Sequence, residues 1–330
     1  MRMMLAGLLL LGAAPMAQAA SFDCGKASTP VEKAICSNPE LSRRDEVLAK
    51  AYATALGGLG DAAKATMQAG QRDWLDYAEL SCTEHATPFT AALNEDQQSC
   101  LLNNYSQRIR LLSESRMQGD WRIYIKTAYD VVDDPDPDVF QEVSANEMMS
   151  PRIDDASETA ASFNALMDEA DAALAPDRSD EGYAASDTMI ETRVVSAGTD
   201  RISLELNSWW MGHGAAHGNY TITYSHYLID KQRMLEASDL FTGDGWQEAL
   251  GQLALAELDR TIDGGIWDES RPEVPKVAID PARWNITGDA LQIIFQPYEV
   301  TAYAAGAPTI SIPWDKLSAY LVEGYGSLLY

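Results

Sequence analysis

The sequence predicts an α+β protein in which a small disulfide-bonded helical bundle precedes an α+β region with an antiparallel sheet and two helices. Three observations predict this class. The four cysteines all lie in the first third of the chain. Apolar residues there recur at helical spacing. The later part holds β-branched and aromatic runs with partial alternation, and they are grouped around two helical segments rather than alternating strictly with them.

The N-terminal residues have the features of a secretory signal peptide. Arg2 gives a positive start, residues 3–16 are mostly Leu, Ala, Gly and Met, and Ala17-Gln18-Ala19 is a small-x-small cleavage pattern. The apolar run is too short to span a membrane, and no later segment is long and apolar enough to do so. We therefore expect a periplasmic or secreted protein without a stable membrane anchor.

Three segments follow from these patterns. We expect a signal peptide at 1–19, a helical disulfide-bonded domain at 20–115 and an α+β domain at 116–330. A mature chain of about 310 residues is longer than one compact core usually holds, which favours two folded domains.

The chain is strongly acidic. It has 24 Lys and Arg against 50 Asp and Glu, a net charge of −26. Such a field repels nucleic acid and anionic lipid and attracts basic proteins or cations. The charge thus excludes a nucleic-acid partner and permits a basic one, although solubility alone also explains it.

The cysteines are Cys24, Cys36, Cys82 and Cys100. An even number in an oxidising compartment indicates two disulfides, for which three pairings exist. We favour Cys24–Cys36 and Cys82–Cys100 because the shorter loops close more readily. A metal site is the alternative, but the spacings lack the close pairs typical of zinc ligands.

Helix signals are clear in the first domain. Thr29 can cap a helix, and Glu32 can complete a capping box. Asn38 before Pro39 is a second such start, and Gly57 ends that helix. Further helices are expected over residues 61–80 and 95–112.

Several phrases in this domain are typical of one family: Phe22-Asp23-Cys24, Val31-Glu32-Lys33-Ala34-Ile35-Cys36, Gln71-Arg72-Asp73-Trp74-Leu75, Cys82, Cys100, Tyr105 and Arg108-Ile109. On these residues the chain resembles the N-terminal domain of LprI-type lysozyme inhibitors over residues 22–112. The resemblance implies a helical, disulfide-bonded extracytoplasmic domain that is linked in some members to lysozyme inhibition.

The second domain is expected to contain the sheet. We expect helices over 160–174 and 246–262 and a hairpin turn at 230–232. The expected strands cover residues 121–125, 189–196, 201–209, 220–229, 284–286, 291–295 and 309–312. Residues 133–138 read as a loop, and its aspartates do not form an EF-hand, because Val139 and Ala145 replace the required glycine and glutamate.

A second resemblance rests on the phrases Gly214–Tyr220, Leu240-Phe241 and Pro297–Gly306. They are similar to the extracytoplasmic domain of unknown function shared by the anti-sigma factor RsiV and some peptidoglycan deacetylases, over residues 121–321. In RsiV this domain recognises lysozyme. The binding candidates taken from these phrases are His217, Asn219, Tyr220, Tyr298 and Tyr303.

Histidines are the weak candidates for a metal site. His213 and His217 have the His-x-x-x-His spacing of zinc sites, and His226 is a third candidate. The surrounding glycines argue against a helix there, and the alternative is that His217 lies in a turn and bonds its backbone. We expect no cofactor and, because no nucleophile or nucleotide motif stands out, no enzyme.

Aromatic residues offer a binding surface or a core. One interpretation is that a group of aromatic residues lines a groove that binds glycan or protein; the alternative is that they lie in the core. These residues are Trp209, Trp210, Tyr220, Tyr224, Tyr298 and Tyr303. We expect a cell-envelope binding protein whose partner is a lysozyme or a related basic muramidase. The alternatives are a peptidoglycan-binding accessory module and a metal-dependent hydrolase that uses His213 and His217.

Overall fold

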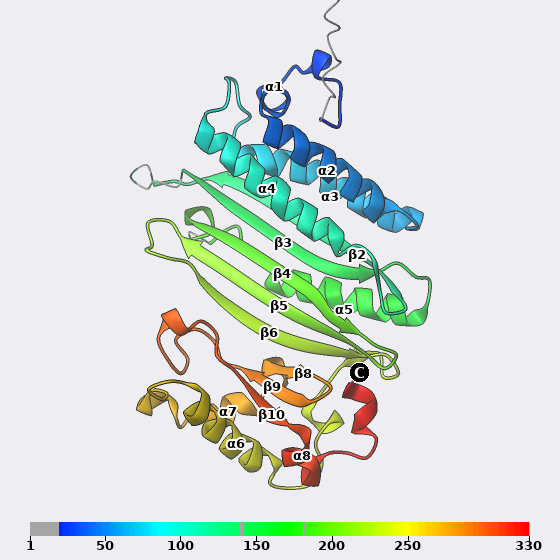
Figure 1. The fold of residues 1–330 in the computed structure, drawn as a ribbon, viewed down its shortest axis with the longest axis vertical. Coiled ribbons are helices and arrows are strands. Elements are labelled where there is room, and N and C mark those ends of the chain that lie inside the picture. Colours follow the sequence, from blue (N-terminus) through cyan, green and yellow to red (C-terminus); the bar gives the residue numbers. More distant parts are fainter. Residues whose placement is uncertain (1–19, 137, 139–141, 181, 330) are drawn as a thin grey trace, which may run out of the picture.

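The computed structural model describes residues 20–136, 138, 142–180 and 182–329. The expected signal peptide at 1–19 therefore lies outside the described residues. Within the described part, four helices are followed by two sheets with further helices, so the mixed α+β class is confirmed (Figure 1).

The N-terminal helices begin and end where their capping residues predict. They are α1 (Pro30–Ser37), α2 (Pro39–Leu56), α3 (Asp61–Leu80) and α4 (Glu95–Ser113). Thr29 and Glu32 form the expected capping box, and the Asn38 side chain accepts from the first turn of α2. Local signals thus determine these boundaries, because each cap satisfies amide groups that the helix leaves unpaired.

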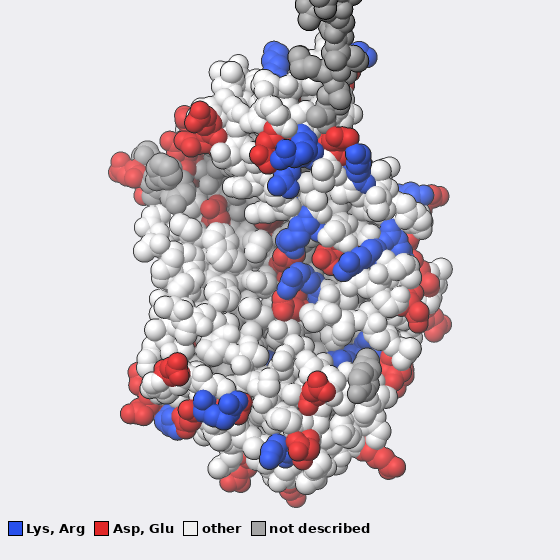
Figure 2. All heavy atoms as spheres, in the orientation of Figure 1, with Lys and Arg blue, Asp and Glu red and all other residues white. Residues whose placement is uncertain are grey.

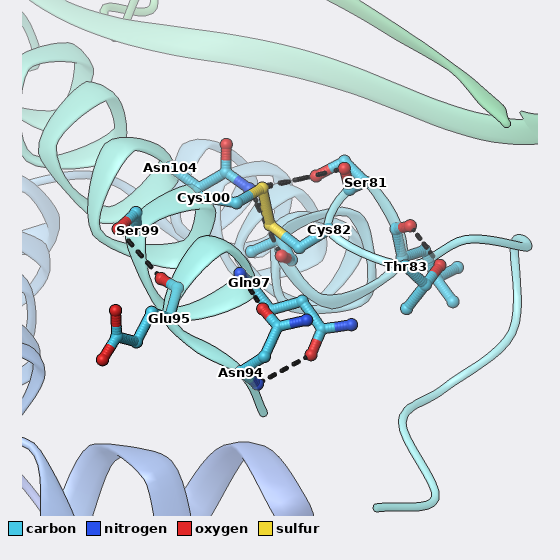
Figure 3. Close-up of a disulfide and its surroundings, with 11 residues drawn as sticks. Ser81, Cys82, Thr83, Asn94, Glu95, Gln97, Ser99, Cys100 and Asn104 are labelled. Carbon is cyan, nitrogen blue, oxygen red and sulfur yellow. Dashed lines mark hydrogen bonds between the residues drawn. A yellow bond between two sulfur atoms is a disulfide. The ribbon is translucent and has the colours of Figure 1, made fainter. Parts of the chain in front are cut away.

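The disulfides join Cys24 to Cys36 and Cys82 to Cys100, which is the favoured pairing. Figure 3 shows the second one between the end of α3 and the first turns of α4. Asn104 donates beside it to the Ser81 hydroxyl at 3.0 Å. This clip holds the loop between α3 and α4 at both ends.

One sheet of seven described strands follows, in the order β1 to β7. The strands are β1 (Met117–Gln118), β2 (Trp121–Asp133), β3 (Val143–Ile153), β4 (Ser186–Ala197), β5 (Arg201–Gly212), β6 (Asn219–Leu228) and β7 (Arg233–Met234). Neighbours are antiparallel except β3 and β4. That pair is parallel because α5 (Glu158–Leu174) connects the two strands as a crossover.

Three features of this sheet differ from the expectation. The sheet is mixed and not purely antiparallel, because β3 and β4 pair in parallel. β2 continues well past Ile125 to Asp133, and β3 was not expected at all. The β3 sequence contains Ala145, Asn146, Glu147 and Pro151, which are residue types that strands disfavour. Its pairing with both β2 and β4 overrides these propensities.

The two faces of the sheet are covered by different helices. Phe163 and Met167 of α5 pack with Ile202 and Leu204 of β5 in one buried cluster. On the opposite face α3 packs on β2, and Tyr129 belongs to the periphery of the helical core. Figure 1 shows α4 in front of the strands and α5 behind them.

A smaller sheet and its helices complete the fold. Its described strands are β8 (Trp284–Ile286), β9 (Ala290–Ile294) and β10 (Thr309–Pro313), in the order β10-β9-β8. The accompanying helices are α6 (Trp246–Thr261), α7 (Val274–Ala278) and α8 (Trp314–Leu317). Their core is centred on fully buried Trp284, Leu250 and Phe295. None of the helices in the described ranges has the length and apolarity that a membrane span requires.

Candidate functional site

The three candidate metal-ligating histidines lie in separate environments. His213 bonds through Nδ1 to Asp134, and its Nε2 lies 3.4 Å from Asp187 Oδ1. His217 donates from Nδ1 to the carbonyl of Gly218 at 2.8 Å, as the turn alternative predicts. Each of these rings is therefore engaged by its own partners.

His226 is a core residue. Its Nε2 donates to the Trp284 carbonyl at 2.8 Å, while its Nδ1 lies 3.0 Å from the Ser203 hydroxyl and 3.2 Å from Arg201 Nη1. Burial, reinforced by the Arg201 charge, lowers the pKa of His226 to about 3, so the ring stays neutral. Among the described residues, no group of three or more His, Cys, Asp or Glu is placed to hold a metal ion.

A tight turn at residues 296–299 builds the candidate binding site. The Glu299 amide donates to the Gln296 carbonyl at 3.0 Å, with Pro297 at the second position of the turn. Tyr298 follows with a φ of 66°. The third position of such a turn normally takes glycine, because a left-handed backbone is unfavourable for a residue with a Cβ.

Side chains anchor this turn on both sides. Glu299 accepts from the Gln296 amide at 2.7 Å and pairs with both terminal nitrogens of Arg283 at 3.0 Å. Gln296 in turn bonds the backbone of Ile222 in β6, accepting from its amide and donating to its carbonyl. The Gln296 side chain therefore replaces a neighbouring strand at this edge of β6.

The turn meets the end of the β5–β6 hairpin. Tyr303 donates to the Gly218 carbonyl at 2.7 Å. A Cβ on Gly218 would lie 2.6 Å from the Trp209 indole nitrogen, so only glycine allows this approach. The fold thus brings into contact the two segments on which the second resemblance rests, Gly214–Tyr220 and Pro297–Gly306.

Four rings gather there, and we call them the ring cluster: His217, Tyr220, Tyr298 and Tyr303. Tyr303 is at its centre. The Tyr303 ring centroid lies 4.3 Å from that of His217 in a stacked pair, 5.3 Å from that of Tyr298 and 6.3 Å from that of Tyr220. Tyr298 is 50% exposed and His217 is also exposed, so the cluster presents ring surface to solvent.

The remaining candidates divide between the two faces of the sheet. Trp209 pairs with Tyr220, and Glu205 with Tyr224, on the face that α4 approaches. Trp210 pairs with Asn219, and their side chains alternate to the opposite face. Asn219 is therefore not brought into the ring cluster; its Oδ1 accepts from the Tyr220 amide at 2.9 Å.

The same face of the sheet carries a buried charged network beneath the helices. Arg108, only 4% exposed, donates to the Tyr129 hydroxyl at 2.9 Å and to Gln71 at 3.0 Å. Arg110 forms a two-point ion pair with Glu191, at 2.6 and 3.0 Å. These bonds attach α4 to β2 and β4.

Glu147 of β3 belongs to this network and carries no local sequence signal. It lines a small cavity between α3, α4 and the sheet, with Tyr77 and Met189 among the walls. Burial, and then repulsion from Glu191, raises the pKa of Glu147 to about 7. The sequence alone does not single out Glu147, because the cavity that buries it forms only when α4 packs over β3 and β4.

Comparison with known proteins assigns two parts of the chain. Residues 24–112 match the family model described as Lysozyme inhibitor LprI. Residues 238–315 match the model described as a protein of unknown function, DUF3298, which is a shorter range than the expected 121–321. No curated protein matches the chain.

Two solved structures of the DUF3298 family are similar to the chain. The one from Bacteroides fragilis is 16% identical, with a TM-score of 0.47, over 64% of this chain and 98% of its own. The one from Pseudomonas aeruginosa is 13% identical, with a TM-score of 0.41, over 64% of this chain and 97% of its own. The similarity to known families thus lies in two separate stretches, residues 24–112 for the LprI model and residues 238–315 for the DUF3298 model.

Proposed function

We propose that this chain is an exported cell-envelope protein that binds and inhibits a lysozyme or a related basic muramidase. The observation that carries the proposal is the match of residues 24–112 to the lysozyme inhibitor LprI model. That segment has its own buried core, centred on Leu41, Trp74 and Leu101, and is closed by both disulfides. It therefore offers a rigid surface that is already formed before a partner binds.

The compartment is part of the proposal. Disulfides persist in oxidising compartments outside the cytoplasm, and the N-terminal residues predict export. A periplasmic or secreted location would place the protein where lysozymes act.

Charge supports a basic partner. A net charge of −26 gives an attractive long-range field for a basic protein and raises the rate of encounter. Figure 2 shows acidic side chains at the periphery of the molecule around both the helices and the smaller sheet. Specific contacts would then determine how long the complex lasts.

Two exposed aliphatic side chains on the helices are the first contacts to test. Val47 of α2 is 41% exposed and Leu75 of α3 is 51% exposed. Buried aliphatic side chains contribute about 1.5–3 kcal/mol each to an interface when they are fully covered. Val195 of β4, 46% exposed, is a matched control outside this segment.

The test is a cell-wall lysis assay with a c-type lysozyme and the mature chain in excess. The parent protein is expected to slow lysis, and Val47→Asp with Leu75→Asp is expected to weaken inhibition at least tenfold. Val195→Asp should inhibit like the parent. Full lytic activity in the presence of excess parent protein would refute the proposal, and equal effects of the two kinds of variant would place the contact elsewhere.

A further inference from the structure

Hydrogen bonds and an ion pair hold the segments that carry the ring cluster in fixed positions. His217 and Tyr220 come from the β5–β6 hairpin, Tyr298 from the turn at residues 296–299, and Tyr303 from the short 3-10 helix Tyr303–Ala305 that follows it. Gln296 and Tyr303 bond this segment to the hairpin. Glu299 and Arg283 fix the turn from beneath. Bonded on both sides, the rings are positioned before any ligand arrives, which lowers the entropic cost of binding.

Tyr298 occupies a position where the backbone favours glycine. Its φ of 66° lies in the left-handed region, which is unfavourable for side chains with a Cβ. Half of the side chain is nevertheless exposed, so burial in the core does not offset this cost. Strained residues of this kind are concentrated in ligand-binding and active sites. The backbone conformation of Tyr298 therefore marks this turn as a candidate ligand site.

The surface beside the cluster carries little charge. Figure 2 shows that the part of this face over the left portion of strands β3–β6 is almost free of Lys, Arg, Asp and Glu. Charged side chains of the turn and of β4 and β5 are paired with each other, Arg283 with Glu299 and Arg193 with Glu205. In a chain with a net charge of −26 this is unusual, and it favours an uncharged ligand over a basic protein.

Polar atoms at the rim can still form hydrogen bonds. The Tyr298 hydroxyl lies 3.5 Å from His217 Nε2, a long contact that leaves both atoms available to a ligand. Apolar ring faces bordered by hydroxyl and imidazole groups match a sugar chain, whose pyranose rings have apolar faces and polar edges. We propose that the ring cluster binds an oligosaccharide, with the exposed ring of Tyr298 stacking against a sugar ring.

This site is independent of the proposed lysozyme contact, which lies on the helices. Three probes suit its chemistry: the β-linked N-acetylglucosamine hexamer, β-linked cellohexaose and α-linked maltohexaose. Titration of the full mature chain by calorimetry, without lysozyme, is expected to show saturable binding to at least one of the three probes at millimolar concentration or below. Comparison of the N-acetylglucosamine hexamer with cellohexaose shows whether the site recognises N-acetyl groups.

Variants locate the binding. Tyr298→Gly removes the ring while giving the turn the residue that its backbone favours, so this variant should fold at least as stably as the parent. Its affinity for the probe is expected to fall about tenfold or more. Trp210→Ala is the matched control, because Trp210 is 52% exposed but lies on the opposite face of the sheet.

Absence of saturable binding to all three probes would overturn this inference. Binding that Tyr298→Gly leaves unchanged, or that Trp210→Ala weakens equally, would also overturn it. Neither result would affect inhibition of lysozyme, so the two proposals fail separately.

Discussion

Replacing Glu147 by Gln tests the contact between the helices and the sheet. The carboxyl group is enclosed by α3, α4 and the strands, near Glu191, Arg108 and Arg110. Its pKa is about 7 in the folded chain, against an ordinary value of 4.5. The folded state therefore holds this proton more tightly than the unfolded state does, and the sign of the pH dependence follows from that difference.

Because the folded pKa is raised, Glu147 lowers stability as the pH rises. Below about pH 4.5 the group is protonated in both states and has no effect; above about pH 7 its ionisation in the folded state has the full effect. The two values differ by about 2.5 pH units, and at 1.36 kcal/mol per unit the effect is about 3 kcal/mol. Glu147→Gln, which keeps the shape and cannot ionise, removes it.

Urea denaturation of parent and variant at about pH 5 and about pH 9 measures this effect. The free energy of unfolding of Glu147→Gln should exceed that of the parent by about 3 kcal/mol at the higher pH and by little at the lower pH. Glu169→Gln on the exposed side of α5 is the control and should show no such change. A difference between parent and Glu147→Gln that is equal at both pH values would show that ionisation of Glu147 does not destabilise the folded chain.

Three further predictions concern the stability of single features. Thr29→Ala removes one half of the α1 capping box and should lower the free energy of unfolding by about 1 kcal/mol, measured by urea denaturation; no change would mean that the cap is dispensable. Replacing both Cys82 and Cys100 by Ser should lower it by about 3 kcal/mol in the same assay, and an unchanged denaturation midpoint would contradict a stabilising role for this clip. Gly218→Ala should displace the Trp209 indole, seen as an altered near-ultraviolet circular dichroism spectrum, whereas an unaltered spectrum would show that the close approach is not needed.

The helical segment could be predicted almost completely from local signals. Thr29 and Asn38 mark helix starts, and the structure begins α1 and α2 one residue after each. The disulfide pairing followed from loop length, and the turn at residues 230–232 separates β6 from β7 as expected. Each of these features depends on residues close together in sequence, which is why they were accessible.

The sheet and the site depend on contacts between distant residues and were less accessible. β3 forms because β2 and β4 pair with it, although its own residues do not favour a strand. The aromatic residues Tyr220 and Tyr298 suggested a binding surface in the sequence. Only the fold shows that Trp210 lies on the opposite face of the sheet. Glu147 gave no sequence signal, because its pKa depends on burial beneath α4.

The central claim, that this chain binds a lysozyme, is tested most directly by the rate of association. The mature chain would be passed over immobilised c-type lysozyme at about 50 mM and about 500 mM salt, where screening differs greatly. We expect saturable binding whose association rate falls severalfold at the higher salt, while the dissociation rate changes little. No saturable binding at either salt concentration would contradict it.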